Sequence, residues 1–174
     1  MDPSRRRFFG SRPSRVAPFR PPWSVAESVF LDVCTRCDDC VRACPTTLLR
    51  RGEGGFPVAD FASAACTFCG ECASACQSGA ITRDASREPW SFTARIDDGC
   101  LARQRVECRV CGEACDARAI RFRLVAGGAP VPELDEAACT ACGACLAPCP
   151  VGAIVRVARP ERSPVSSMLS MEVS

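Results

Sequence analysis

The first cysteine-rich segment reads Cys34-Thr35-Arg36-Cys37-Asp38-Asp39-Cys40-Val41-Arg42-Ala43-Cys44-Pro45. Its spacing is C-x2-C-x2-C-x3-C, so three thiols share one tight loop and the fourth lies about one helical turn beyond the third. Thiols held this closely can converge on one compact group, and soft thiolates select zinc or iron–sulfur clusters. The segment therefore predicts a metal site.

The pattern recurs along the whole chain, because the 16 cysteines among 174 residues form four groups of four. The groups are Cys34, Cys37, Cys40 and Cys44; Cys66, Cys69, Cys72 and Cys76; Cys100, Cys108, Cys111 and Cys115; and Cys139, Cys142, Cys145 and Cys149. Only group three departs from the common spacing, and it reads C-x7-C-x2-C-x3-C. Groups one and two are offset by 32 residues and the last three cysteines of groups three and four by 34, which indicates two halves with two groups each.

In two-cluster bacterial ferredoxins, the fourth cysteine of such a run ligates the other cluster. The same rule predicts four [4Fe–4S] clusters here. The predicted ligand sets are Cys34, Cys37, Cys40 and Cys76 for cluster 1; Cys66, Cys69, Cys72 and Cys44 for cluster 2; Cys100, Cys108, Cys111 and Cys149 for cluster 3; and Cys139, Cys142, Cys145 and Cys115 for cluster 4. Because each cluster needs both groups of its half, we expect the clusters to staple the fold.

Composition limits the alternatives. Zinc ribbons use two C-x2-C pairs about 15–20 residues apart rather than uninterrupted quartets, so zinc is the weaker interpretation. The chain has no His, which excludes Rieske clusters, His-ligated haem and Ser-His or Cys-His catalytic pairs. Every cysteine has a predicted metal role, so we do not expect an enzyme. A formal charge of +2 does not suggest a nucleic-acid-binding protein.

The residues between the groups predict an α+β fold. We expect two tandem ferredoxin-like units with two clusters each, built from short helices after the third cysteine of each group and small antiparallel hairpins. Strands are expected at residues 80–82, 92–96 and 153–157, and the alternation around residues 120–124 predicts a hairpin strand. The predicted segments are a basic, Pro-rich arm (1–27), the first unit (28–85), the second unit (86–158) and a flexible tail (159–174).

The N-terminus contains Ser4-Arg5-Arg6-Arg7-Phe8-Phe9, which resembles a twin-arginine export motif. A working signal continues with about 7–15 apolar residues, whereas this segment continues with prolines and arginines. We interpret it as an uncleaved arm of a cytoplasmic protein. No apolar run approaches the roughly 20 residues of a membrane span.

The chain resembles the NapF family, the ferredoxin-type accessory proteins of periplasmic nitrate reductase systems. The resemblance rests on the basic arm, the segment Arg20-Pro21-Pro22-Trp23-Ser24, the four cysteine groups, and Val106-Glu107-Cys108-Arg109 in the irregular third group. It implies a cytoplasmic protein that binds the precursor of the catalytic subunit NapA and assists loading of its [4Fe–4S] cluster before export. Electron transfer by a polyferredoxin is the alternative function.

Two further expectations concern contacts with a partner. Arg5, Arg6, Arg7 and Trp23 are candidate partner-binding residues. For Trp23, a role as a packing anchor that pins the arm to the body is the other interpretation. The longer first gap of group three is expected to hold cluster 3 less rigidly, because closing a longer loop costs more entropy.

Overall fold

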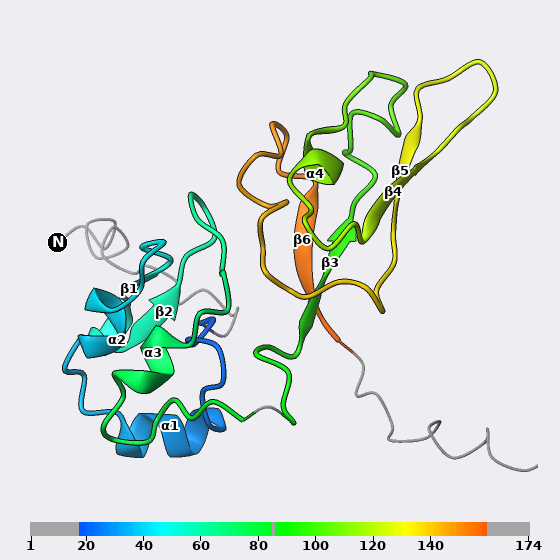
Figure 1. Cartoon of the computed structure of the whole chain (residues 1–174). Coiled ribbons are helices and arrows are strands. Elements are labelled where there is room, and N and C mark those ends of the chain that lie inside the picture. Colours follow the sequence, from blue (N-terminus) through cyan, green and yellow to red (C-terminus); the bar gives the residue numbers. More distant parts are fainter. Residues whose placement is uncertain (1–17, 85, 160–174) are drawn as a thin grey trace, which may run out of the picture.

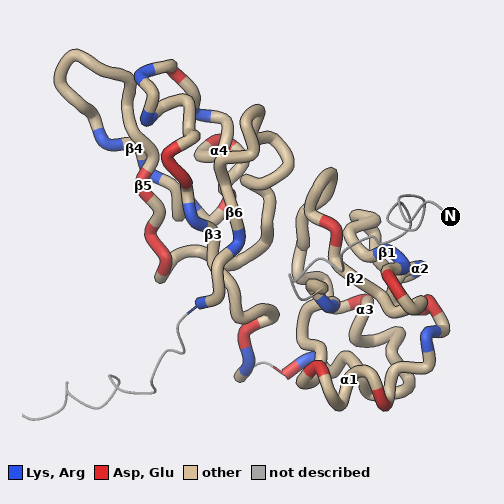
Figure 2. The backbone as a smooth tube through the Cα atoms, turned by 180° about the vertical axis from the view of Figure 1, so that it is seen from behind, with Lys and Arg blue, Asp and Glu red and all other residues tan. Residues whose placement is uncertain are grey.

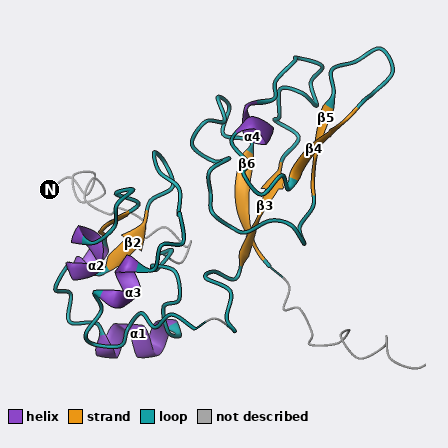
Figure 3. Ribbon diagram, viewed as in Figure 1, coloured by secondary structure: helices purple, strands orange, loops and turns teal. Residues whose placement is uncertain are grey.

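The computed structural model describes residues 18–84 and 86–159 (Figure 1). Arg5, Arg6, Arg7 and most of the C-terminal tail lie outside the described residues. The elements in chain order are α1 (Glu27–Val33), α2 (Asp39–Arg42), β1 (Leu49–Arg51), the 3-10 helix η2 (Glu53–Gly55), β2 (Pro57–Ala59), α3 (Glu71–Ser74), β3 (Phe92–Ile96), α4 (Val110–Glu113), β4 (Ile120–Arg123), β5 (Val131–Leu134) and β6 (Ile154–Ala158). Loops and turns form most of both units (Figure 3). None of the described helices has the length and apolar character needed to cross a bilayer.

Each unit contains one antiparallel hairpin between its two cysteine groups. In the first unit β1 pairs with β2, with Leu49 opposite Ala59, and in the second β4 pairs with β5, with Ile120 opposite Leu134. The expected strand alternation is present, because Ile120 is buried and Arg121 is exposed. The predicted α+β arrangement of small hairpins and short helices is thus observed.

A third antiparallel pair closes the second unit. Strand β3 precedes group three and β6 follows group four, and they pair with Phe92 opposite Ala158 and Ile96 opposite Ile154. The strands predicted at residues 92–96 and 153–157 therefore exist, and the second is shifted by one residue.

The first unit closes differently, and here the expected strand at residues 80–82 is wrong. Only one bridge forms, between Ile81 and Ser24, flanked by hydrogen bonds from the Val25 amide to the Ala80 carbonyl (3.1 Å) and from the Thr82 amide to the Trp23 carbonyl (3.1 Å). Two prolines precede Trp23 and restrict the backbone there, so a regular strand cannot extend through the arm. Residues 18–26 nevertheless pack into the first unit, and α1 follows them directly.

The short helices differ from the expectation in position and number. Helices α2, α3 and α4 contain the third cysteine of groups one, two and three instead of following it. In group four the same stretch, residues 144–148, forms turns. Four-residue helices have little stability of their own, so the surrounding tertiary contacts decide whether each one forms.

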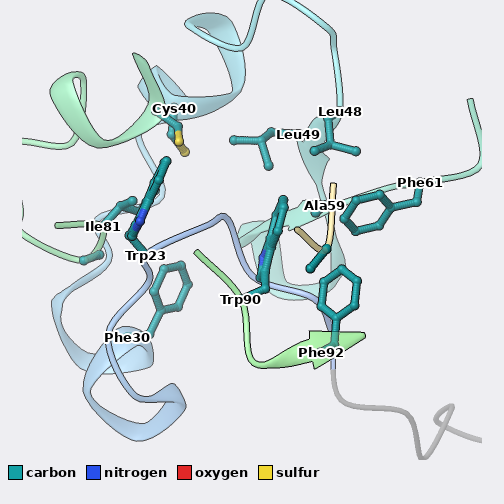
Figure 4. Close-up of a cluster of buried hydrophobic side chains, with 13 residues drawn as sticks. Trp23, Phe30, Cys40, Leu48, Leu49, Ala59, Phe61, Ile81, Trp90 and Phe92 are labelled. Carbon is teal, nitrogen blue, oxygen red and sulfur yellow. The ribbon is translucent and has the colours of Figure 1, made fainter. Parts of the chain in front are cut away.

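The apolar core of the first unit is aromatic and extends into residues of the second half (Figure 4). Phe30 of α1 is 0% exposed, and Trp90 and Phe92 pack around Phe61, at ring-centroid distances of 5.3 and 5.7 Å. Ala141, from the group-four loop, belongs to this same core. The second unit has a smaller core around Ile96, Ile120 and Ile154, which is consistent with a fold that relies on its cysteine sites.

Candidate metal centres

The thiols predicted for cluster 1 lie around the start of α2. Burial and, after it, the nearby thiols of Cys76, Cys34 and Cys37 together raise the pKa of the Cys40 thiol to about 11. Cys76 comes from group two and reaches this site because α2 and α3 pack against each other. The structure thus brings together the four cysteines that the crosswise rule assigns to cluster 1.

The thiols predicted for cluster 2 line one cavity of the first unit, together with Trp23 and Leu49. They are Cys44, Cys66, Cys69 and Cys72. Burial raises the pKa of Cys72 to about 12, and the Cys66, Cys40 and Cys69 thiols add to the shift. Burial also raises the pKa of Cys44, but hydrogen bonds led by the Leu49 amide outweigh it and leave the value lowered.

The second unit repeats this arrangement in two cavities. One is lined by Cys100, Cys108, Cys111 and Cys149, and the other by Cys115, Cys139, Cys142 and Cys145. Burial raises the pKa of Cys145 to about 12, with Cys142 and Cys139 as the strongest neighbouring charges. The predicted sets for clusters 3 and 4 therefore each surround one cavity.

Backbone amides point at several of these sulfur atoms. The amides of Phe68, Ala119 and Ala153 donate hydrogen bonds of 3.3 Å to the Sγ atoms of Cys66, Cys115 and Cys149, respectively. Such N–H groups stabilise thiolates and tune the potential of a bound iron–sulfur cluster.

The donor set fits [4Fe–4S] clusters. At the sites of clusters 2, 3 and 4, thiols with apolar neighbours surround a cavity, as ligands of a polynuclear cluster do. In the part of the chain that the structure describes, no three Cys, Asp or Glu side chains converge as ligands of a single metal ion. Metal binding must displace the protons of the buried thiols whose pKa is raised, so the bound group has to offset that cost.

The insertion in group three forms a hydrogen-bonded turn. The Gln104 amide donates to the Cys100 and Leu101 carbonyls (3.1 and 3.0 Å), and the Val106 amide donates to the Leu101 carbonyl (2.9 Å). Ala102 is buried beneath this turn. These local hydrogen bonds offset part of the loop-closure entropy that the sequence spacing suggests.

The structure favours the packing role of Trp23. Its side chain is 5% exposed, its amide donates to the Pro89 carbonyl (2.9 Å), and the guanidinium of Arg83 lies 5.3 Å from the ring centroid. The ring also lines the cluster 2 cavity. The arm is therefore anchored beside a metal site.

Sequence reasoning missed the residues that join the two halves. Arg156 of β6 places its guanidinium 3.8 Å from the Phe19 ring centroid and 5.0 Å from that of Phe61. The Cys66 amide donates to the Cys142 carbonyl (2.9 Å). A basic residue on a strand and a loop carbonyl carry no distinguishing pattern, so nothing in the sequence pointed to these contacts.

Two family models match the chain, each described as a 4Fe-4S dicluster domain, over residues 33–81 and 104–153. The ferredoxin-type protein NapF of Escherichia coli K12 is 44% identical over 155 residues, which cover 88% of this chain and 94% of that protein. NapF of Haemophilus influenzae is 49% identical over 135 residues, 78% of this chain and 76% of that protein. The chain belongs to the NapF family of ferredoxin-type proteins.

More distant relatives share the ferredoxin-type description. The methylamine utilization ferredoxin-type protein MauM of Methylorubrum extorquens is 33% identical over 156 residues, 79% of this chain and 71% of that protein. The protein is thus an iron–sulfur protein of the ferredoxin type with two dicluster domains. The second domain match begins at residue 104, within the longer first gap of group three, so Cys100 lies outside the matched region.

Proposed function

We propose that this NapF-family protein holds four [4Fe–4S] clusters in the cytoplasm and serves in maturation of the periplasmic nitrate reductase catalytic subunit, NapA, before its export. The observation that carries the proposal is the match to NapF over 94% of the Escherichia coli protein. It is supported by three thiol sets that each line a cavity and by a fourth set whose thiols lie near one another. The clusters supply labile iron–sulfur units or electrons. The chain's own residues hold them through thiolates and direct N–H groups at the sulfur atoms.

The distribution of exposure supports exchange with a partner. Cys37 and Cys69, the second cysteines of groups one and two, are exposed, whereas Cys40 and Cys72 beside them are buried. An incoming thiolate from a partner can reach the exposed ligands first, and ligand exchange at thiolate-bound iron proceeds one ligand at a time. The first unit is therefore the better candidate for cluster release.

The mixed positive and negative charge of the surface supports a protein as the partner. Arg and acidic residues alternate in sign over both units (Figure 2), and several form exposed pairs, such as Arg50 with Asp60 (2.7 Å) and Arg123 with Glu133 (2.5 Å). Blue and red segments are interspersed along the backbone of both units in Figure 2, and the formal net charge is +2, so we do not propose a nucleic-acid partner.

Electron transfer is the second candidate function, and the contact between the Cys66 and Cys142 loops favours it because it places a site of each unit next to the other. The two functions predict different fates for the iron. Cluster donation predicts net loss of iron to the partner, whereas electron transfer predicts a reversible redox change at constant iron content.

The test uses the full-length protein loaded with isotopically labelled iron and mixed anaerobically with the apo form of the catalytic subunit. We expect labelled iron to appear in the re-isolated subunit. The control is a Cys37→Ala and Cys69→Ala double variant, which removes a ligand of clusters 1 and 2. Because it also binds less iron, transfer is compared as the fraction of bound label, and that fraction is expected to be lower than for the wild type. A wild-type protein that keeps all of its label while changing oxidation state contradicts the maturation role.

A further inference from the structure

The loops that hold clusters 2 and 4 touch each other across the boundary between the two units. The Cys66 amide donates to the Cys142 carbonyl at 2.9 Å, and these residues belong to the predicted ligand sets of clusters 2 and 4. A ligand of one unit therefore lies directly beside a ligand of the other.

Close packing reinforces this contact. Gly143 follows Cys142, has a φ of +79°, and would place a Cβ atom only 2.2 Å from Cδ1 of Phe61. Ala141, on the other side of Cys142, is 4% exposed within the core of the first unit. Leu146 packs against the cores of both units. The group-four loop is thus embedded in the first unit, and only a residue without a side chain fits at position 143.

Within each unit, the two predicted cluster sites also lie next to each other. Cys40 of cluster 1 and Cys72 of cluster 2 belong to the same buried core, and the helices that carry them, α2 and α3, pack against each other, so these two sites are adjacent. In the second unit, Cys111 of cluster 3 shares one small core with Cys115 and Cys145 of cluster 4. Each site therefore lies next to the following one in the order cluster 1, cluster 2, cluster 4 and cluster 3.

We propose that the two units form one continuous path for electrons whose spatial order is cluster 1, 2, 4, 3, with the Cys66–Cys142 contact as its crossing point. The inference rests on the four-cluster part of the proposed function, and it holds whether or not the protein donates a cluster. Each step oxidises one cluster by one electron and reduces the next by one, and it moves no proton. The electron comes from an external one-electron donor and leaves to an external one-electron acceptor.

Double variants that leave one cluster in each unit test the order. Cys37→Ala with Cys108→Ala leaves clusters 2 and 4, whereas Cys69→Ala with Cys142→Ala leaves clusters 1 and 3. After reduction with dithionite, we expect magnetic coupling in the electron paramagnetic resonance spectrum of the first protein and two independent signals in the second. Uncoupled clusters 2 and 4, or equal coupling in both proteins, overturn the proposal.

Iron content separates this outcome from a failure of the four-cluster assignment. Each double variant should retain about half of the wild-type iron, since two of four equivalent clusters remain. Iron well above half of the wild-type amount contradicts the four-cluster assignment, whereas a variant that loads no iron is replaced by the glycine variants below. If the iron is halved but the reduced clusters 2 and 4 show no magnetic coupling, the proposed electron path is contradicted and the four-cluster assignment is not.

A second pair of variants decides the question if the double variants do not load. Gly143→Val drives a side chain into Phe61 and should separate the units, with loss of the inter-unit part of the coupling in the fully reduced protein. Gly152→Val is the matched control, since Gly152 also has a positive φ (+62°) but no atom within 4 Å of its added Cβ. Equal spectra of the two glycine variants contradict the crossing point.

Discussion

Iron counting can distinguish crosswise ligation from ligation within each cysteine group. In the structure Cys76 lies with Cys34, Cys37 and Cys40, although it belongs to the sequence group of Cys69. A Cys37→Ala and Cys76→Ala double variant therefore damages one cluster, whereas Cys69→Ala with Cys76→Ala damages two.

The expected magnitudes follow from four clusters of equal iron content. The Cys37/Cys76 variant should lose about a quarter of the iron and acid-labile sulfide, and the Cys69/Cys76 variant about half. The assay is iron and sulfide per protein chain after anaerobic purification, with each single variant expected to lose about a quarter. The reverse result, half for the first pair and a quarter for the second, would refute crosswise ligation in the first unit.

Three further predictions concern stability. Phe61→Ala should lower the free energy of unfolding by about 3–5 kcal/mol because it opens a cavity beneath Trp90. Phe122→Ala removes a half-buried ring and should lower the free energy of unfolding by less. Anaerobic denaturant titration, followed by tryptophan fluorescence, compares the two variants. Hydrogen bonds from Arg20 hold the pKa of Glu27 below its ordinary value. The pair therefore stabilises the fold above the ordinary carboxyl pKa, and this contribution is lost as pH falls through the lowered pKa. It amounts to at most about 1 kcal/mol, because the Glu27 side chain is 46% exposed. Glu27→Gln should therefore reduce the acid sensitivity of the melting temperature, and an unchanged pH profile would contradict this assignment. Removing iron with a chelator should abolish most of the far-ultraviolet circular dichroism signal, whereas an apoprotein that keeps it would show that the clusters do not staple the fold.

The grouping of the thiols was predictable because the spacing of three of the four in each set is a local property. Three thiols on one loop share a site wherever the loop lies. Strands β3, β4 and β6 were predictable because each coincides with a short run of residues whose apolar positions suit a half-buried sheet. The helices were placed less accurately, since elements of four residues take their boundaries from neighbouring packing.

The arm shows how tertiary context changes a local expectation. Pro21, Pro22 and Trp23 predict an irregular segment, and the segment is irregular, but it also closes the first unit through the bridge between Ser24 and Ile81. Whether Trp23 faces solvent or the core depends on which groups its ring can pack against in the folded protein. Here the ring lines the cluster 2 cavity and lies next to the guanidinium of Arg83, so it faces the core.

The sequence by itself determined the class of cofactor, the two-unit organisation and the candidate ligands, because repeated cysteine spacing restricts the chemistry before any folding takes place. Only the tertiary structure decided which sites of the two units become neighbours. That arrangement depends on Phe61 packing against Gly143 and on Arg156 stacking on Phe19, contacts between segments far apart in the chain. Such contacts form because the side chains fit together and are buried from water, and the spacing of residues along the chain does not predict them.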